Sequence, residues 1–188
     1  MPVNQLHTTD AALVALAGGR NRDPFAVLGP HVEDGRLVIR AFHPSARSID
    51  LLLLPDHEPR PMVRHGSSGA FEIALERQVR LKPDAAYETD EVPDYRLRIT
   101  YPGDHVIDVD DPYRYGRVLT DFDIHLLGEG THLHAFEKLG AHRISVGPAT
   151  GTHFAVWAPN ADRVSVIGDF NAWDGRVHPM RAIAPGGF

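Results

Sequence analysis

Cysteine is absent from the 188-residue sequence. A disulfide framework and a zinc site built on thiolates are therefore excluded. The absence fits a protein of the reducing cytoplasm, and we expect a cytoplasmic location. The composition is otherwise that of a globular protein, with 43% hydrophobic and 23% charged residues.

Positive charge is also in short supply, because 19 Lys and Arg residues face 25 Asp and Glu residues and leave a net charge of −6. Nucleic-acid-binding domains are usually basic, so we expect no nucleic-acid partner. Long apolar runs are missing as well, since none approaches the roughly 18 residues that span a membrane. Residues 1–10 lack the basic start and the apolar stretch of a signal peptide, and we expect no membrane partner.

The first 109 residues carry the pattern of a β-domain after a short helix. The helix is predicted over 10–17 and ends at a glycine pair. Runs of apolar residues, several of them alternating with polar ones, predict strands over 36–42, 48–54, 70–75, 95–101 and 105–109. Pro55, Pro59 and Pro61 interrupt the chain after the second of these strands, and residues 80–92 are predicted to form a polar loop.

Residues 110–143 lose the strand alternation and are predicted to form a helical connector. A short helix is expected over 121–127, ended by Gly128. A second helix, capped by Thr131, is expected to run to Gly140. We expect this connector to pack against the β-domains on both sides of it.

Strand patterning returns in residues 144–188. It predicts strands over 152–158 and 163–168, joined by a turn. The next stretch, Gly168-Asp169-Phe170-Asn171-Ala172-Trp173-Asp174-Gly175, is rich in turn residues and places Trp173 on a loop. A tryptophan held there is either a core plug or a flat platform for the apolar face of a sugar. Trp157, by contrast, lies within a predicted strand and is expected to pack in the core.

The two halves of the sequence share a pattern at a shift of 115 residues. Without a gap, Ile39, Phe42, Pro44, Ala46, Ile49 and Leu51 fall on Phe154, Trp157, Pro159, Ala161, Val164 and Val166. Two β-sandwich modules of common ancestry explain this pattern, and convergence on a common hairpin is the alternative. The copies differ at the loop, because the second has Trp173 where the first has Glu58 and no aromatic residue nearby.

Several motifs follow one another along the chain. They are Asp23-Pro24-Phe25-Ala26-Val27-Leu28-Gly29, Asp111-Pro112-Tyr113-Arg114-Tyr115-Gly116, Leu127-Gly128-Glu129-Gly130-Thr131-His132, Leu139-Gly140-Ala141-His142, Phe154-Ala155-Val156-Trp157-Ala158-Pro159-Asn160-Ala161 and Val164-Ser165-Val166-Ile167-Gly168-Asp169-Phe170-Asn171-Ala172-Trp173. On these motifs nearly the whole chain resembles the N-terminal region of bacterial glycogen branching enzymes of the α-amylase superfamily. The resembled region includes a starch- and glycogen-binding module and precedes a catalytic barrel.

The resemblance implies a non-catalytic role in a 1,4-α-glucan branching enzyme, which cleaves an α-1,4 linkage and rejoins the chain through α-1,6. The implied partners are α-1,4-glucan, as glycogen or maltooligosaccharide, and the enzyme's own catalytic barrel. Catalytic residues would lie beyond Phe188, so none is assigned and the chain alone is expected to be inactive. The alternatives are the same module of a debranching or trehalose-forming relative, and a purely structural support that binds no sugar.

Trp173 and Asn171 are the predicted carbohydrate-binding residues. The Trp173 ring would stack on a sugar, and the Asn171 amide can both donate to and accept from hydroxyl groups. The alternative for Asn171 is a turn residue that bonds its own backbone. The alternative for Trp173 is packing in a core or between domains.

Twelve histidines raise the question of a metal site. The best cluster joins His132 and His134 with His125 and His142, and it lacks acidic or cysteine partners at ligand spacing. No metal and no cofactor is therefore expected.

Three aspartates lie close together at the start of the predicted connector. Asp108, Asp110 and Asp111 lack the longer regular pattern of a calcium loop, and we expect them in a solvated turn. Tyr113 and Tyr115 flank the same turn and are expected to pack between domains.

The predicted fold is mainly β, with two tandem immunoglobulin-like β-sandwich modules joined by a short helical connector. The N-terminal module is assigned to residues 1–109, the connector to 110–143 and the glucan-binding module to 144–188. A sandwich of this type has about seven strands, whereas 144–188 hold three or four. We therefore expect the second module to be incomplete, truncated at its C-terminus.

Overall fold

The computed structural model describes residues 10–78, 92–147, 149–184 and 186–188. These residues fall into two compact units. The first unit comprises the described residues through Ala17 and residues Phe25–Arg114, and the second comprises Gly18–Pro24 and Tyr115–Phe188. The predicted polar loop at 80–92 lies outside the described residues except for Val92.

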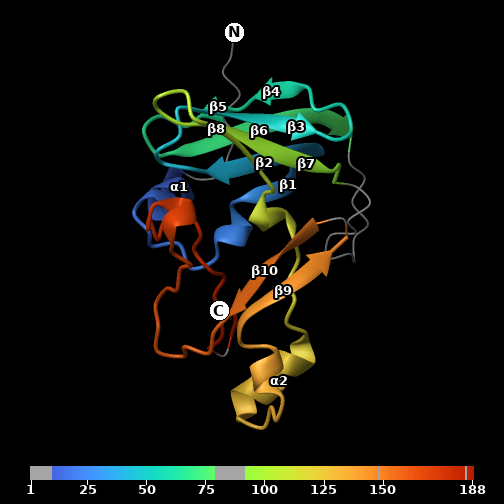
Figure 1. The fold of residues 1–188 in the computed structure, drawn as a ribbon, viewed down its shortest axis with the longest axis vertical. Helices are drawn as coiled ribbons and strands as arrows, with labels where there is room; N and C mark the ends of the chain where they lie inside the picture. The colour runs from blue at the N-terminus through green and yellow to red at the C-terminus, as the bar shows by residue number, and fades with distance from the viewer. Residues whose placement is uncertain (1–9, 79–91, 148, 185) are drawn as a thin grey trace. The chain divides into compact units, whose positions relative to one another are not determined.

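The first unit is a β-sandwich of two antiparallel four-stranded sheets (Figure 1). One sheet has the strand order β1 (Gly29–Glu33), β2 (Arg36–Phe42), β6 (Ala70–Gln78) and β5 (Val63–Arg64). The other has the order β4 (Pro59–Pro61), β3 (Ser48–Leu53), β7 (Tyr95–Thr100) and β8 (Val106–Val109). All five strands predicted for this part of the chain are present.

Three short strands, β1, β4 and β5, lack a clear signal in the sequence. β4 contains Pro59 and Pro61 and forms an edge of its sheet, where it pairs with β3. A proline is tolerated at an edge because its missing N–H can face away from the ladder. The sequence suggests that these prolines end the strand pairing. In the structure they instead lie in the edge strand of the sheet.

Inward-pointing residues of both sheets form the main hydrophobic core. Ile39 of β2, Leu51 of β3, Phe71 of β6 and Leu97 of β7 are almost fully buried in it. Their alternation along each strand directs every second side chain to the same face. Full burial of one such side chain stabilises the fold by roughly 1.5–3 kcal/mol.

Helix α1 (Asp10–Ala17) covers the opposite face of the first sheet, over the range predicted. Leu13 and Leu16 of α1 form a second buried cluster with Phe42 and Ala70. The short helices η1 (Pro24–Ala26) and η3 (Pro112–Arg114) complete the element order of this half.

The face under α1 also contains a buried ion cluster. The Nε atom of Arg40 donates to Glu72 at 2.5 Å, and its two Nη atoms donate to the carboxylate oxygens of Glu33 at 2.8 and 2.6 Å. Burial alone would lower the pKa of Arg40, but the bonds to Glu33 and Glu72 raise it overall. The guanidinium is therefore charged, buried and paired.

Asp111 is buried in the first unit, so the expectation of a solvated turn is wrong for this residue. It accepts hydrogen bonds from the Tyr95 hydroxyl at 2.6 Å and from the Tyr113 backbone N–H at 3.0 Å. The Tyr113 ring packs edge-on against Phe25 within the same unit, with ring centroids 5.0 Å apart. Asp108 instead lies at the surface, where Arg98 donates to both of its oxygens at 2.7 and 2.8 Å.

The second unit contains helix α2 (Asp121–Glu129), held by a capping box. Thr120 Oγ1 accepts from the Asp123 backbone N–H at 3.1 Å, and the Asp123 carboxylate accepts from the Thr120 backbone N–H at 3.0 Å. The helix passes Gly128 and ends at Gly130, whose φ of 70° closes it in the left-handed conformation. The predicted stop at Gly128 is therefore two residues early.

The second predicted helix of the connector is wrong in extent. Only the single turn η4 (Ala135–Glu137) forms, and it follows His134 rather than Thr131. Strand β9 (Gly140–Val146) then starts inside the segment expected to be a helical connector. It pairs antiparallel with β10 (Ala149–Ala155), with Gly140 opposite Ala155.

The chain after β10 forms isolated antiparallel bridges in place of the strand predicted over 163–168. Val156 exchanges two backbone hydrogen bonds with Phe188, at 2.8 and 2.9 Å. Val166 N donates to His178 O and Met180 N donates to Val164 O, on either side of Pro179. These contacts leave Ser165 in an isolated bridge to Pro179.

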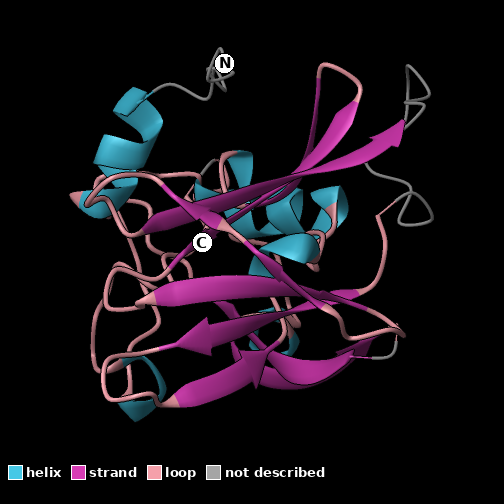
Figure 2. Ribbon diagram, turned by 90° about the horizontal axis from the view of Figure 1, so that it is seen from above, coloured by secondary structure: helices cyan, strands magenta, loops and turns pink. Residues whose placement is uncertain are grey.

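The predicted mainly β character is confirmed, as Figure 2 shows, while the immunoglobulin-like type of the modules stays a prediction. No described helix is long and apolar enough to cross a membrane.

Candidate functional site

The candidate site is the loop that contains the single turn η5 (Asp169–Asn171) in the second unit. Gly168 O accepts from the backbone N–H groups of Asn171 at 3.1 Å and Trp173 at 3.0 Å. Asp174 N donates to Asn171 O at 3.0 Å, and Val177 N donates to Asp174 O at 3.1 Å. The turn residues identified in the sequence thus form a closed, hydrogen-bonded loop.

Two consecutive residues of this loop adopt a backbone conformation that residues other than glycine usually avoid. Ala172 has a φ of 52° and Trp173 a φ of 59°, both in the left-handed region. For a residue other than glycine this conformation costs roughly 1–2 kcal/mol, and such strain is concentrated at binding and active sites. The backbone bonds of the loop hold both residues there.

Trp173 is 63% exposed, so it is not a core plug within this unit. Phe170, three residues earlier on the same loop, is 65% exposed. Gly168 permits this placement, because a Cβ atom there would lie 2.5 Å from the Phe170 ring. The loop therefore carries two large aromatic side chains at the surface.

The Trp173 ring is fixed by its own polar atom. Its Nε1–H donates to Asp169 Oδ1 at 2.9 Å. The sequence offers the pair only as a spacing of four residues within a turn, and no role for Asp169 follows from that spacing alone. With the indole N–H engaged, the ring's faces are what remain for a ligand.

Asn171 is 8% exposed and bonds within the loop. Its Oδ1 accepts from Gly168 N at 2.9 Å, and its Nδ2 donates to Val166 O at 2.8 Å and to His178 Nδ1 at 3.0 Å. Burial lowers the pKa of His178, which favours the neutral ring that can accept this bond. The structure thus gives Asn171 a loop-holding role, and its predicted contact with sugar stays a prediction.

The end of the loop is fixed by an ion pair. Arg176 donates from its Nη2 to Asp174 Oδ2 at 2.6 Å and from its backbone N–H to Asp174 Oδ1 at 2.9 Å. The side-chain bond from Arg176 lowers the pKa of Asp174. The carboxylate therefore stays ionised at neutral pH.

The sequence predicts that Trp157 packs in a core, and this prediction is wrong. Trp157 follows the end of β10, forms an isolated bridge to Gly187 and is 37% exposed. The correspondence with Phe42 fails because Phe42 is buried in the cluster with α1, whereas neither buried cluster of the described residues includes Trp157.

The histidines of the predicted connector each bond to a different nearby group. His132 Nε2 lies 3.1 Å from Asp123 Oδ1, His134 Nδ1 lies 3.1 Å from Glu137 Oε1, and His142 Nε2 lies 2.9 Å from Leu139 O. Within the described part of the chain, no group of three or more His, Asp or Glu side chains converges as a metal site would require.

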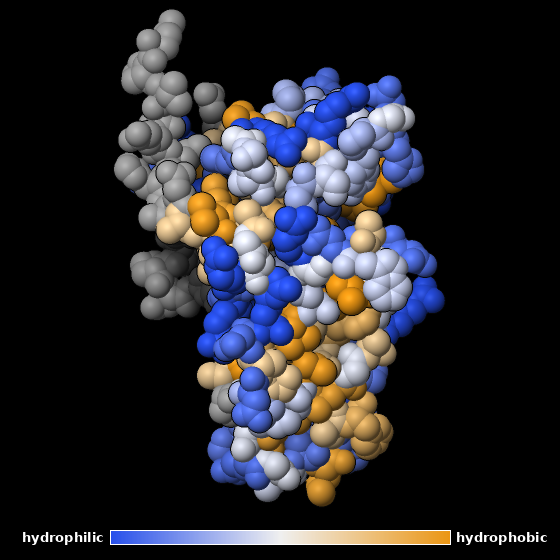
Figure 3. Space-filling view, turned by 90° about the vertical axis from the view of Figure 1, so that its left-hand side faces the viewer, coloured by the Kyte–Doolittle hydropathy of each residue, from blue (hydrophilic) through white to orange (hydrophobic). Residues whose placement is uncertain are grey.

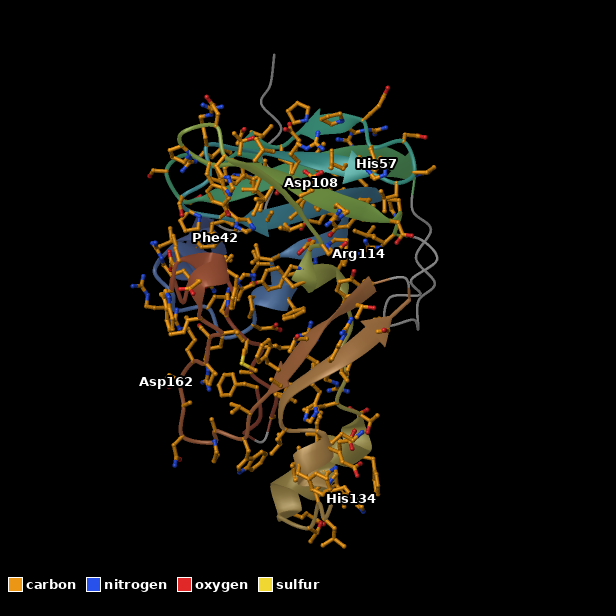
Figure 4. All side chains as sticks on the ribbon, viewed as in Figure 1. Phe42, His57, Asp108, Arg114, His134 and Asp162 are labelled. Carbon is orange, nitrogen blue, oxygen red and sulfur yellow. The ribbon has the colours of Figure 1, made fainter. Side chains whose placement is uncertain are left out.

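A second feature of this unit is an exposed apolar corner. It is formed by Phe122 of α2, by Leu133, and by Phe136 of η4. These three side chains are all largely exposed, and Leu133 reaches 89%. Figure 3 shows apolar surface at the level of α2, and Figure 4 shows the neighbouring His134 at the same end of the unit. Large exposed apolar patches commonly mark interaction surfaces.

Comparison with known families places both halves of the sequence. Residues 9–113 match the family model described as alpha-1,4-glucan branching enzyme GlgB, N-terminal domain. Residues 138–188 match the model described as carbohydrate-binding module 48 (isoamylase N-terminal domain). The η5 loop lies within the second match.

Curated relatives carry the same description. The chain is 48% identical to the 1,4-alpha-glucan branching enzyme GlgB of Rhodospirillum rubrum over 91% of its own length and 22% of that protein. It is 49% identical to the GlgB of Paramagnetospirillum magneticum, over 89% of the chain and 20% of the relative. It is 41% identical to the GlgB of Rubrobacter xylanophilus, over 92% of the chain and 22% of the relative. The chain thus spans about a fifth of the length of these relatives.

Among solved structures, the ligand-free PulA of Klebsiella pneumoniae aligns with 49% of this chain and 8% of its own, at 19% identity and a TM-score of 0.33. At this TM-score the similarity carries no argument about fold or function.

Proposed function

This chain belongs to the family of the GlgB N-terminal domain, and we propose that it is the non-catalytic N-terminal part of a 1,4-α-glucan branching enzyme. In this role it binds α-1,4-glucan, as glycogen or maltooligosaccharide, and positions it for a catalytic barrel. The barrel cleaves an α-1,4 linkage and rejoins the chain through α-1,6. The absence of cysteine supports a cytoplasmic location for this work.

The observation that carries the proposal is the exposed ring of Trp173 on a hydrogen-bonded loop. An aromatic face gives a glucose ring a large apolar contact. A rigid ring loses little conformational freedom on binding, which preserves affinity. The match of residues 138–188 to a carbohydrate-binding module supports the same assignment.

Phe170, on the same loop as Trp173, is a second aromatic residue that we assign to glucan contact. Its exposure equals that of Trp173 within a few per cent, and its ring lies 5.6 Å from that of His178. A glucan chain is longer than one sugar ring, so two aromatic side chains on one loop suit consecutive residues of a polymer. Asn171 supports both by holding the loop, and a hydroxyl contact from its amide belongs to the proposal as well.

Binding without chemistry is sufficient for a useful role. A module that holds one part of a long glucan raises the effective concentration of the rest near the catalytic barrel. Retaining glycosyl transfer needs two carboxyl groups across the scissile bond. We assign this pair to the barrel, outside these 188 residues.

We assign the apolar corner of Phe122, Leu133 and Phe136 to contact with that barrel. The relatives are about four times as long as this chain, so most of their length is available to cover such a surface. The Thr120–Asp123 capping box fixes the start of α2, from which Phe122 projects. The same corner also favours a second candidate function, in which the chain supports the barrel and binds no sugar.

Glucan binding by the 188-residue chain separates the two candidates. Electrophoresis in native gels with and without glycogen measures the affinity as retardation of the band. The glucan-binding proposal predicts retardation that maltoheptaose relieves by competition. Unchanged mobility at glycogen concentrations that retard a known starch-binding module leaves the support role as the better account.

A further inference from the structure

The contact between Asp169 and Trp173 has a consequence beyond the stacking itself. We propose that Asp169 is a positioning residue, whose carboxylate orients the indole ring for glucan. This inference rests on the proposed function of Trp173 and adds a residue to which no role has been assigned. Asp169 and Trp173 are both exposed, so their bond is not forced by close packing around them.

An anchor of this kind matters because the side chain of Trp173 is 63% exposed. The backbone of Trp173 is fixed by its N–H bond to Gly168 and by its left-handed φ of 59°. Beyond the backbone, an exposed tryptophan rotates about two side-chain torsions. The bond from Nε1 to Asp169 Oδ1, at 2.9 Å and four residues back, removes much of that rotation.

The geometry of the loop makes Asp169 a suitable anchor. Its backbone C=O accepts from Ala172 N at 3.2 Å, so the residue is tied to the same turn that carries Trp173. A carboxylate accepts strongly from an N–H donor, and because the indole N–H lies in the plane of the ring, the bond itself covers neither face. The second carboxylate oxygen is not needed for this contact.

The bond also defines what the platform recognises. An indole N–H that is free can donate to a sugar hydroxyl, but here it is already used. Trp173 therefore contributes apolar contact, and the hydroxyl groups of the glucan must find other partners. This division predicts tolerance toward the pattern of hydroxyl groups at the stacked sugar, with selectivity set elsewhere.

The test uses the 188-residue chain with Trp157→Phe, so that Trp173 is the only tryptophan and its fluorescence can be followed alone. Asp169→Ala should lower the fluorescence anisotropy of Trp173 and weaken glycogen binding about threefold to tenfold, the range expected when one side chain must be ordered on binding. Asp169→Asn keeps an acceptor oxygen and should restore both. Asp162→Ala removes the same charge from an exposed turn of this unit (Figure 4) and should change neither.

A double-mutant cycle covers the case in which Asp169→Ala disturbs the loop. Trp173→Phe removes the N–H, so adding Asp169→Ala to it should cause no further loss of glycogen affinity. An equal loss in both backgrounds would overturn the proposal, as would unchanged anisotropy in Asp169→Ala.

Two further results have distinct meanings. If Asp169→Asn keeps the anisotropy but loses affinity as Asp169→Ala does, the carboxylate acts on the sugar directly and the positioning role is refuted. If the parent chain fails to bind glycogen while the anisotropy follows the predicted order, the proposed function fails and the anchoring of Trp173 by Asp169 stands.

Discussion

Replacing Asp111 by asparagine should make the stability of the first unit less sensitive to a rise in pH from 4.5 to 7.5. Asp111 is 1% exposed, and burial raises its pKa from 3.8 to about 6, against the opposing effect of the bonds from Tyr95 and Tyr113. Asparagine has nearly the same shape. Its amide oxygen can accept from Tyr113 N–H, and its NH₂ can donate to the Tyr95 oxygen.

The sign follows from proton binding. Because the pKa is higher in the folded state, the folded protein binds the proton more tightly than the unfolded chain. Stability from this group is therefore full below about pH 4 and is lost as the pH rises through about 6. The difference between the two pKa values corresponds to about 3 kcal/mol, of which about 2 kcal/mol separates pH 4.5 from pH 7.5.

Urea unfolding of the parent chain and of Asp111→Asn at these two pH values measures the effect. The asparagine variant should gain about 2 kcal/mol relative to the parent between pH 4.5 and pH 7.5. Comparing the two proteins cancels the titration of every other group. Asp110→Asn, at the neighbouring exposed position, should track the parent. If Asp111→Asn also tracks the parent, folding does not raise the pKa of the buried carboxyl.

Two other substitutions test the contacts that shape the units. Arg40→Ala should destabilise the first unit by about 3–5 kcal/mol in urea unfolding, because it leaves Glu72 buried without its cation. The double variant Arg40→Met with Glu72→Met should recover most of that loss. If the single and the double variant lose the same stability, packing rather than charge dominates at this site. Thr120→Ala should lower the free energy of unfolding of the second unit by about 1 kcal/mol, because the capping box is lost. Thr131 is the other cap expected from the sequence, and Thr131→Ala should have little effect on that free energy. The reverse order would contradict the observed start of α2.

The sandwich of the first unit is readable from the sequence because its signal is local. Apolar residues such as Ile49, Leu51, Leu97 and Ile99 alternate along their strands, and the alternation alone assigns them to one face. The edge strand β4 is not readable in this way, because Pro59 and Pro61 argue against a strand until the free edge beside β3 is known.

The second unit is less readable because its contacts are long-range or depend on capping geometry. Gly128 and Gly130 are equivalent as helix stops in the sequence, and only the left-handed φ of Gly130 distinguishes them. The strand predicted over 163–168 reduces to an isolated bridge between Ser165 and Pro179, a pairing between separate segments that the local pattern does not specify.

The candidate site divides in the same way. The turn residues around Trp173 predict its loop position, and the structure places the ring at the surface. The three hydrogen bonds of Asn171 within the loop and the bond of Asp169 to the indole depend on the folded turn, so neither follows from residue types alone.

The glycogen affinity of Trp173→Ala, measured beside that of Trp157→Ala, tests the central claim most directly. Losing one stacked aromatic platform should weaken binding roughly tenfold to hundredfold, by analogy with the 1–3 kcal/mol of base–aromatic stacking. The melting temperature should change by only a few degrees, because the Trp173 ring is exposed. Trp157→Ala, which removes a tryptophan outside the η5 loop, should leave the affinity within about twofold of the parent. An unchanged affinity in Trp173→Ala, or a larger loss in Trp157→Ala, would contradict the assignment of this loop as the glucan platform.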